Sequence, residues 1–327
     1  MDTTLAKMRS GKLFRLALGI VLAAVFSWLI LRHAQWADVR RAFRGADLRW
    51  IGAALLAFAL GYGCRIQRWR LMLKPGNPSL RWLTCAGPFL SSFAVNNVLP
   101  FRAGDVLRSF AFNSKLGTSS GVVVATLLAE RVLDLLMVLA FLAFVPSLPH
   151  ASGTSFSNVG LVVALAIAAP ILLMLFFPDT IVPLARITGR VARRVSPKLE
   201  RAILDETQKA LFTIRHLMHG TNLLNLVFWS LLSWIAEGCI FWFAALALPS
   251  IGVPLESWVA LPVGTLATLI PSTPGYLGTF DYFTVRAMSV HGNPAEAAAA
   301  YALLVHALLW LPPTILGGLY LMFRKSE

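Results

Sequence analysis

A polar and helix-breaking stretch at residues 96–108 lies between apolar segments of membrane-spanning length, and it limits the folds that this chain can adopt. The stretch contains two Asn, a Pro, a Gly, two Arg and an Asp. Each bare charge or unpaired amide costs several kcal/mol in hydrocarbon, so a lipid-facing helix cannot hold this set. The stretch is therefore either a polar interfacial loop or a broken helix that lines a cavity.

A second broken stretch, at residues 271–281, resembles the first. Both contain a Pro, three further residues, a Gly and an Asp soon after it. The residues are Pro100, Gly104 and Asp105 in the first stretch, and Pro274, Gly278 and Asp281 in the second. Interrupted hydrophobic segments at corresponding places in two halves of a chain indicate a transporter binding site.

The composition excludes an ordinary soluble protein. Of the 327 residues 57% are hydrophobic and 13% are charged, whereas soluble domains carry about 25% charged residues. The net charge of +14 comes mainly from short loops beside apolar runs, so we expect no nucleic acid partner but contact with anionic inner-leaflet lipids. No zinc spacing, Walker loop or dinucleotide fingerprint is present in the sequence, and we predict no metal site and no cofactor.

The apolar runs predict an all-α polytopic membrane protein, with residues 1–327 as a single transmembrane domain. The first run, 16–31, lacks a small-x-small cleavage site, so we interpret it as an uncleaved span rather than a signal peptide. Broken hairpins are expected at about 82–116 and 256–292, and a basic amphipathic helix pair at about 178–221. The other spans are expected at about 50–66, 121–145, 158–177, 222–248 and 298–322.

The positive-inside rule favours broken segments that enter and leave the membrane on the same side. With the N-terminus in the cytoplasm, two such segments also place the basic residues 178–221 and the C-terminus there. A simple crossing at 82–100 would instead put the eight basic residues of 178–221 outside. The 32–49 connector disagrees with the rule under either arrangement, and we attribute this to interfacial Arg residues.

The prediction is thus a bacterial-type inner-membrane protein with six spans and two re-entrant hairpins. The hairpins enter from opposite sides, as in an inverted repeat. Two crossings per broken segment give the same loop sidedness, so eight spans is the alternative.

The first broken segment offers a site for a lipid headgroup. Arg102 and Arg108 carry planar donors that suit phosphate, and Asn96 and Asn97 can donate to and accept from hydroxyl groups. Gly104 would let the backbone approach a ligand closely. The alternative is an interfacial loop whose Arg side chains reach toward water.

Ionisable residues inside the predicted spans are further candidates, because such residues face the protein interior or water. Glu130 and Asp134 share one helix face, and Arg131 is close enough in sequence to pair with Asp134. They form either a site wall or proton relay, or an internal salt bridge. Glu237 is either a coupling-proton carrier or the partner of an Arg elsewhere. His306 is interpreted as a packed polar residue.

The second broken segment is expected to form the other half of the cavity. Its candidate residues are Pro274, Gly275, Gly278 and Asp281. The alternative is a tight turn in which Asp281 caps the following helix. Residues 65–70, with three Arg and a Trp, follow a predicted span and are expected to anchor it at the membrane interface.

Together these motifs resemble the lysylphosphatidylglycerol synthase transmembrane-domain family of flippase-like proteins. The resemblance covers residues about 10–323. It rests on Asn-Asn-x-Leu-Pro-x-Arg-x-Gly-Asp-x-x-Arg at 96–108, Glu-Arg-x-x-Asp at 130–134 and Pro-Gly-x-x-Gly-x-Phe at 274–280. In the family the last motif usually continues with Glu, whereas Asp281 stands here, with the same charge and a shorter reach. The resemblance implies a lipid translocase without the soluble aminoacyl-transferase domain of two-part relatives, for which no polar stretch here is long enough.

We therefore expect a flippase that moves a polar-headed, anionic or glycosylated lipid between leaflets without nucleotide hydrolysis. The residues expected to hold its phosphate are Arg102, Arg108 and Arg131, and those expected to contact hydroxyl or amine groups are Asn96, Asn97 and Asp105. One alternative is a membrane-embedded transferase that acts on a lipid, with Glu130, Asp134 and His306 as candidate acids or bases. The other is a non-transporting partner of a lipid-synthesising enzyme.

Overall fold

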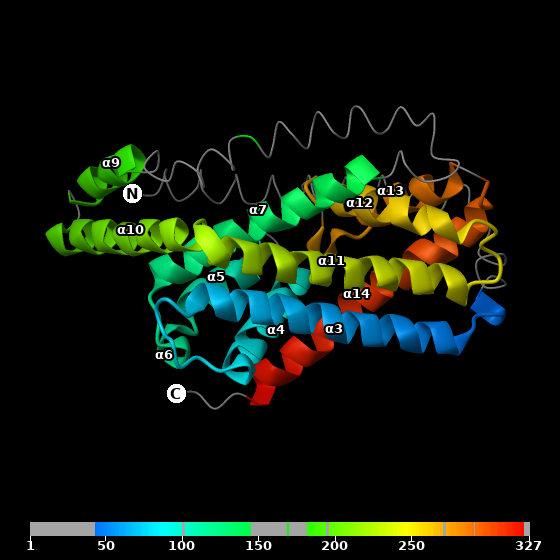
Figure 1. The fold of residues 1–327 in the computed structure, drawn as a ribbon, viewed down its shortest axis with the longest axis horizontal. Helices are drawn as coiled ribbons and strands as arrows, with labels where there is room; N and C mark the ends of the chain where they lie inside the picture. The colour runs from blue at the N-terminus through cyan, green and yellow to red at the C-terminus, as the bar shows by residue number, and fades with distance from the viewer. Residues whose placement is uncertain are drawn as a thin grey trace, which may run out of the picture.

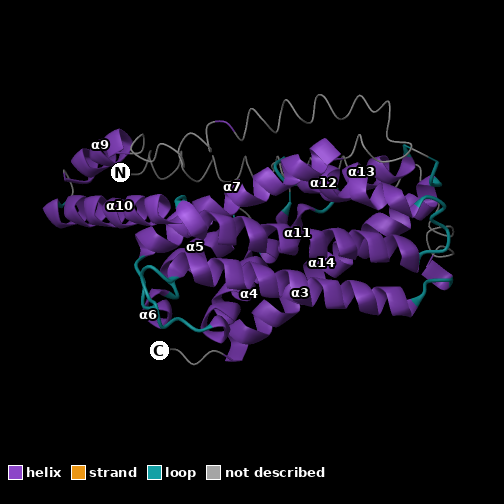
Figure 2. Ribbon diagram, viewed as in Figure 1, coloured by secondary structure: helices purple, strands orange, loops and turns teal. Residues whose placement is uncertain are grey.

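The structure, a computed structural model, is helical throughout the part that it describes and contains no strand there (Figure 2). The described residues are 43–99, 102–144, 169, 182–193, 196–270, 273–290 and 292–323. The expected spans at 16–31 and 158–177 lie outside these residues, as do Pro100 and Pro271.

Four long helices form the frame of the molecule. They are α3 (Leu48–Leu73), α7 (Ser120–Phe144), α11 (Gly220–Ala247) and α14 (Ala295–Phe323). Each has at least 25 residues, which exceeds the roughly 20 residues that cross a bilayer. By length and composition α11 and α14 are clear apolar spans, whereas α3 and α7 carry several charged residues. The helices expected at 50–66, 121–145, 222–248 and 298–322 are therefore present.

The two broken segments fold as pairs of short helices. In the first, α4 (Trp82–Val98) packs against α5 (Ala103–Phe110), which is followed by the single turn α6 (Asn113–Leu116). In the second, α12 (Ser257–Ala267) packs against α13 (Thr279–Ser289). The short turns of the second segment are η3 (Pro254–Glu256) and η4 (Pro274–Tyr276). At 1.5 Å per residue, α5 is only about 12 Å long, and α12 and α13 are each about 16 Å long.

The helices repeat in the same order in the two halves of the chain. A long helix, a short hairpin and a second long helix occur as α3, α4–α5 and α7, and again as α11, α12–α13 and α14. The first helices of the halves pack side by side in opposite directions, since Asp47 N at the start of α3 donates to Ala247 O at the end of α11, at 2.9 Å (Figure 1). The hairpins also pack across the halves, because α4 packs mainly on α14 and α12 packs on α7 as well as on α11.

The basic region at 178–221 contains a helix pair, as expected. α9 (Val182–Arg193) packs on α10 (Pro197–Leu217), and the pair extends past one end of the helix bundle (Figure 1). Ser196 caps α10 by accepting a hydrogen bond from Lys198 N at 3.2 Å, and Pro197 occupies the first turn, where its missing N–H costs nothing.

Glu206 ties α10 to the start of α7. Gly121 N donates to its carboxylate, and Lys209 Nζ lies 3.0 Å from Glu206 Oε1. Burial raises the pKa of Glu206, but hydrogen bonds from Gly121, Lys209 and Ser119 outweigh this, so its pKa lies below the usual value. The contact therefore adds stability that is present above the pKa of the unfolded residue and is lost as pH falls through the lower pKa of the folded state.

Acidification from about pH 7 to about pH 3 is expected to speed amide hydrogen exchange at the start of α7, because protonated Glu206 is a weaker acceptor for Gly121 N–H. The rates are measured by mass spectrometry and corrected for the intrinsic effect of pH. Glu206→Gln keeps an acceptor without the charge, so it should exchange faster than wild type at pH 7 and show little further change on acidification. Equal exchange in the two proteins at pH 7 would contradict this role.

Candidate functional site

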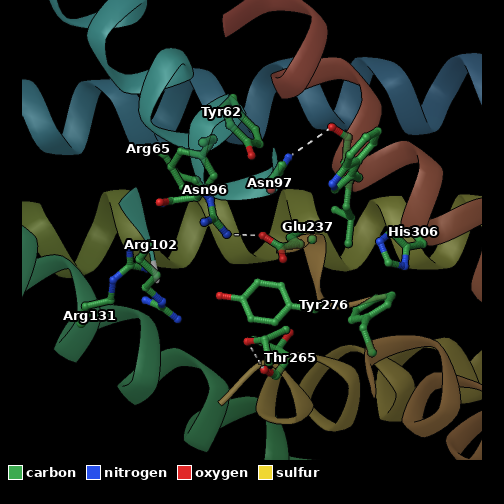
Figure 3. A pocket seen from close by; sticks show the side chains of 16 residues that line it. Tyr62, Arg65, Asn96, Asn97, Arg102, Arg131, Glu237, Thr265, Tyr276 and His306 are labelled. Carbon is green, nitrogen blue, oxygen red and sulfur yellow. Dashed lines mark hydrogen bonds and ion pairs between the residues drawn. The ribbon is translucent and has the colours of Figure 1, made fainter. Parts of the chain in front are cut away.

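A cavity of about 200 Å³ lies where the tips of the two hairpins meet. Its wall combines charged and hydroxyl-bearing side chains from both halves of the chain, most of which point toward one another in Figure 3. The polar lining residues are Tyr62, Arg65, Asn96, Asn97, Arg102, Arg131, Glu237, Thr265, Thr268, Tyr276 and His306. The other lining residues are Phe93, Gly275, Phe280, Leu309 and Trp310.

The hairpin tips are held together on α14. Asn97 Nδ2 donates to Thr314 Oγ1 at 2.8 Å and to Trp310 O at 3.3 Å, which fixes the end of α4. A Cβ placed on Gly275 would lie 2.5 Å from Trp310 Nε1 and 3.4 Å from Asn97 O. Only a glycine fits here, all the more because Gly275 has a φ of 71°.

The first hairpin turns through Arg102, which has a φ of 52°, and is closed by the side chain of Asn96. Asn96 Oδ1 accepts from Gly104 N at 2.8 Å, and its Nδ2 donates to Asp105 Oδ1 at 2.9 Å. The other oxygen of Asp105 accepts from Arg131 Nη2 on α7 at 3.0 Å. These contacts place Arg102 and Arg131 side by side in the cavity wall (Figure 3).

The second hairpin is closed in a similar way by Asp281. Its Oδ2 accepts from Gly278 N at 2.9 Å, which caps α13, and its Oδ1 lies 2.7 Å from His306 Nδ1 on α14. Gly278 and Tyr276 have φ values of 85° and 60°, so the turn before α13 requires left-handed backbone. The result is an Asp–His pair at the edge of the cavity, with His306 in its lining.

Arg65 and Arg68 of α3 connect the cavity wall to the ion pairs behind it. Arg65 forms an ion pair with Glu237 of α11 at the cavity surface. Arg68 Nη1 lies 2.8 Å from both Asp134 Oδ1 and Ser230 Oγ. Trp234 Nε1 also donates to Asp134 Oδ1, at 3.2 Å.

Arg108 and Glu130 form the most deeply buried ion pair among the described residues. Their side chains are 0% and 1% exposed, and Arg108 Nη2 lies 2.7 Å from Glu130 Oε2. The Arg108 guanidinium also lies 4.8 Å from the Trp69 ring and 4.9 Å from the Phe89 ring. This packing leaves Arg108 out of the cavity lining.

Two of the three arginines in the cavity wall have a carboxylate partner. Arg65 is paired with Glu237, and Arg131 with Asp105. Within the described residues no carboxylate lies within 4.0 Å of the third, the Arg102 guanidinium. An anion that enters the cavity would therefore meet planar N–H donors that no ion pair occupies, which is the chemistry that recognises phosphate.

Comparison with known proteins identifies the family. A family model described as "Lysylphosphatidylglycerol synthase TM region" matches residues 16–317. The chain belongs to this family. The UPF0104 membrane protein PH1989 of Pyrococcus horikoshii is 23% identical to it over 341 residues, which cover 96% of this chain and 98% of that protein.

Two further members come from Methanocaldococcus jannaschii. UPF0104 membrane protein MJ1078 is 24% identical over 69% of this chain and 92% of its own length. UPF0104 membrane protein MJ1595 is 21% identical over 80% of each chain. The resemblance inferred from the sequence motifs is thereby confirmed, and the chain is a membrane protein with apolar transmembrane helices.

The residues predicted from the family motifs divide into two groups. Those that line the cavity are Asn96, Asn97, Arg102, Arg131, Gly275 and the coupling candidate Glu237. Those that hold the lining residues or pack behind them are Gly104, Asp105, Arg108, Glu130, Asp134, Pro274, Gly278 and Asp281. Contact of any of them with a substrate stays a prediction.

Two expected local arrangements are wrong. Arg131 does not pair with Asp134, because it points toward α5 and pairs with Asp105, while Asp134 faces α3 and pairs with Arg68. Arg65 and Arg68 do not anchor a helix end at the membrane interface. α3 continues to Leu73, and both guanidinium groups are buried in ion pairs with residues of other helices.

The sequence interpretation also missed several residues of the cavity. Tyr62, Arg65, Tyr276 and Trp310 line it without having been assigned to a site, and His306 lines it although it was named only as a candidate acid or base of the transferase alternative. A signal existed for two of them, since Arg65 and His306 are ionisable residues next to or inside apolar runs. Glu237 does have an Arg partner, which was one of the two interpretations of this residue.

Proposed function

We propose that this family member is a lipid translocase that moves a polar-headed, anionic or glycosylated lipid between membrane leaflets. The observation that carries the proposal is the polar cavity between two short hairpins, in which the Arg102 guanidinium has no carboxylate within 4.0 Å among the described residues. A cavity of this kind could shelter a charged headgroup while the acyl chains stay in the bilayer. The family's link to membrane lipids supports a lipid as the substrate.

The proposed membrane arrangement has six spans and two re-entrant hairpins within a single transmembrane domain. The short helices α5, α12 and α13 support it, because none reaches across the roughly 30 Å of hydrocarbon. The opposite directions of α3 and α11 support entry of the hairpins from opposite sides. Eight crossings stay the alternative.

In the proposed orientation both termini and the α9–α10 pair are in the cytoplasm, at the inner membrane. Exposed Arg186, Arg190, Arg193 and Arg201 would there face the anionic inner leaflet.

In the proposed mechanism the headgroup phosphate binds to Arg102 and Arg131. Asn97 would contact hydroxyl or amine groups through Oδ1, since its Nδ2 donates to α14, and Asn96 through the second N–H of its Nδ2. Arg108 takes a less direct part than the sequence suggested, since its charge is committed to Glu130 behind the cavity wall. Alternating access would follow if each hairpin opened toward its own side of the membrane while the other stayed closed.

Arg102→Ala is expected to slow lipid translocation ten- to a hundredfold. The reason is that a hydrogen bond to a charged group contributes about 1.5–3 kcal/mol, and each 1.4 kcal/mol is a factor of ten. The measurement is leaflet-specific quenching of fluorescent phosphatidylglycerol in proteoliposomes that contain equal amounts of folded protein. Arg81→Ala is the matched control, because Arg81 is exposed at the start of the same hairpin and lies outside the cavity. An Arg102→Ala protein that moves lipid as fast as wild type would rule out the phosphate contact.

A lipid-modifying transferase is the second candidate, and the Asp281–His306 pair favours it. A histidine oriented by a carboxylate, with Nδ1 and Oδ1 2.7 Å apart, can serve as a general base toward a hydroxyl group in the cavity. Formation of a modified lipid from an added donor by the purified protein would support this candidate. Translocation without any such product would support the translocase.

A further inference from the structure

The two hairpins are fastened by equivalent contacts. Asp105 is the third residue of α5, and Asp281 is the third residue of α13. Each carboxylate binds a side chain of the long helix that follows its hairpin. Asp105 binds Arg131, which is 26 residues later on α7, and Asp281 binds His306, which is 25 residues later on α14.

Each carboxylate also fastens the turn of its own hairpin through its second oxygen. Asp105 Oδ1 accepts from Asn96 Nδ2 at 2.9 Å, and Asp281 Oδ2 accepts from Gly278 N at 2.9 Å. Each Asp therefore joins the turn of a hairpin to a frame helix. The two Asp residues occupy the same position in their helices, bind the corresponding long helix and lie at a similar sequence distance from their partners. The two contacts therefore have the same mechanical role in the two halves.

The two contacts differ in the chemistry of the cation. A guanidinium stays protonated at every physiological pH, so the Asp105–Arg131 contact is permanent. An imidazole can gain or lose a proton under physiological conditions, so of the two contacts it is the one between Asp281 and His306 that can respond to protons. A charge-assisted hydrogen bond is roughly twice as strong as a neutral one.

We propose that His306 is a proton-binding site and that, with Asp281, it forms a proton-sensitive latch on the second hairpin. Asp281 occupies Nδ1, so the proton is taken up and released at Nε2. Uptake makes an imidazolium–carboxylate pair that holds α13 on α14, and release weakens the latch and frees the hairpin to move. The first hairpin, held by an arginine, does not respond to pH in this way.

The surroundings of His306 make its proton sensitive to the contents of the cavity. Asp281 on α13 is 5% exposed and His306 is 9% exposed, so bulk water screens this pair weakly. The other charged or titratable groups that line the same cavity are Tyr62, Arg65, Arg102, Arg131, Glu237 and Tyr276. An anion bound in the cavity would favour the imidazolium, so by linkage the anion and the proton would bind with positive coupling.

The latch is tested first by a measurement that does not depend on transport. Hydrogen exchange of peptides spanning residues 276–281 is followed at about pH 5.5 and about pH 8 and corrected for the intrinsic effect of pH. The wild type is expected to be protected at low pH and several-fold less protected at high pH. His306→Arg, which copies the first hairpin, should be protected at both, and His306→Gln at neither. The same pH response in His306→Arg as in wild type would overturn the proposal.

The reciprocal substitution on the first hairpin, Arg131→His, gives a second test in case His306→Arg does not fold. Arg131→His should give the first hairpin a pH-dependent protection at residues 102–108 that the wild type lacks there. Loss of protection at residues 102–108 in Arg131→His at both pH values would still show that the Asp105–Arg131 contact holds the first hairpin. Wild-type exchange of the second hairpin in every His306 variant would overturn the latch.

The link to translocation rests on the proposed function and is tested separately. In proteoliposomes with fluorescent phosphatidylglycerol, the wild-type rate is expected to change between about pH 5.5 and about pH 8, and His306→Arg should remove that change. If no protein moves this lipid while hydrogen exchange follows the predicted pattern, the latch stands and the proposed function fails. A wild-type pH profile retained in His306→Arg would instead break the link between latch and transport.

Discussion

Glu130→Ala is expected to destabilise the protein by about 3–5 kcal/mol, since it removes one partner of a buried ion pair and leaves the other charge uncompensated. Arg108 is 0% exposed and is enclosed by Trp69 and Phe89, so its guanidinium cannot reach water after the carboxylate is lost. Arg68 Nη2, 4.0 Å from Glu130 Oε1, would also lose a neighbouring charge. The variant should accumulate poorly, and the Tm of any purified protein should fall by many degrees.

The control for this prediction is Glu200→Ala on α10, whose partner Arg193 is 72% exposed. An exposed ion pair contributes about 0–1 kcal/mol, so this variant should melt close to wild type. The double variant Arg108→Met with Glu130→Leu should recover much of the lost stability, because no charge stays buried alone. Thermal unfolding in detergent, followed for all three variants, makes the comparison. A Glu130→Ala protein as stable as wild type would show that the pair contributes little to the fold.

Gly104→Ala is expected to disrupt the first hairpin. A Cβ at this position would lie 1.8 Å from Ser92 O and 2.7 Å from Ser92 C, and both are backbone atoms of α4 that cannot rotate away. The two helices must therefore separate, which also lengthens the Gly104 N to Asn96 Oδ1 hydrogen bond of 2.8 Å. Overpacking of this kind costs about 1–3 kcal/mol or more.

Gly104→Ala should reduce transport more clearly than stability, because the turn of the first hairpin positions Arg102 in the cavity wall. Lipid translocation should fall at least tenfold at equal folded amount, by the same reasoning as for loss of the arginine itself. Gly52→Ala is the matched control, because a Cβ there has no atom within 4 Å and an alanine favours a helix interior by roughly 0.5–1 kcal/mol. Wild-type Tm and transport in Gly104→Ala would contradict the close packing of α4 and α5.

The broken segments were predictable because their signals are local. Pro, Gly and charged residues inside apolar runs marked 82–116 and 256–292, and the short helices α4–α5 and α12–α13 lie there. The inward-facing charges of α7 were also predictable, since lipid would not accept them. α7, α11 and α14 lie close to the expected spans because hydropathy marks them, whereas α3 continues to Leu73, beyond the expected end of its span at residue 66.

The pairing of the charges was not predictable from spacing. Arg65 and Glu237 are 172 residues apart, and Arg68 and Asp134 are 66 apart, so no local pattern connects them. Arginines near the end of an apolar run looked like an interfacial anchor. The antiparallel packing of α3 on α11 brings Arg65 to Glu237, and the contact of α3 with α7 brings Arg68 to Asp134. The cavity itself depends on contact between the two hairpin tips, which belong to different halves of the chain.

The packing of the first hairpin on the second half of the chain has a consequence for biosynthesis. Asn97 finds Thr314 only after a further 217 residues have been made. At 5–20 residues per second this takes roughly 10–40 s. During that time the polar turn around Arg102 has neither α14 nor the second hairpin beside it, and it has to be kept from lipid by water or by the insertion machinery. The first hairpin is thus completed by α14, a helix that is made long after it.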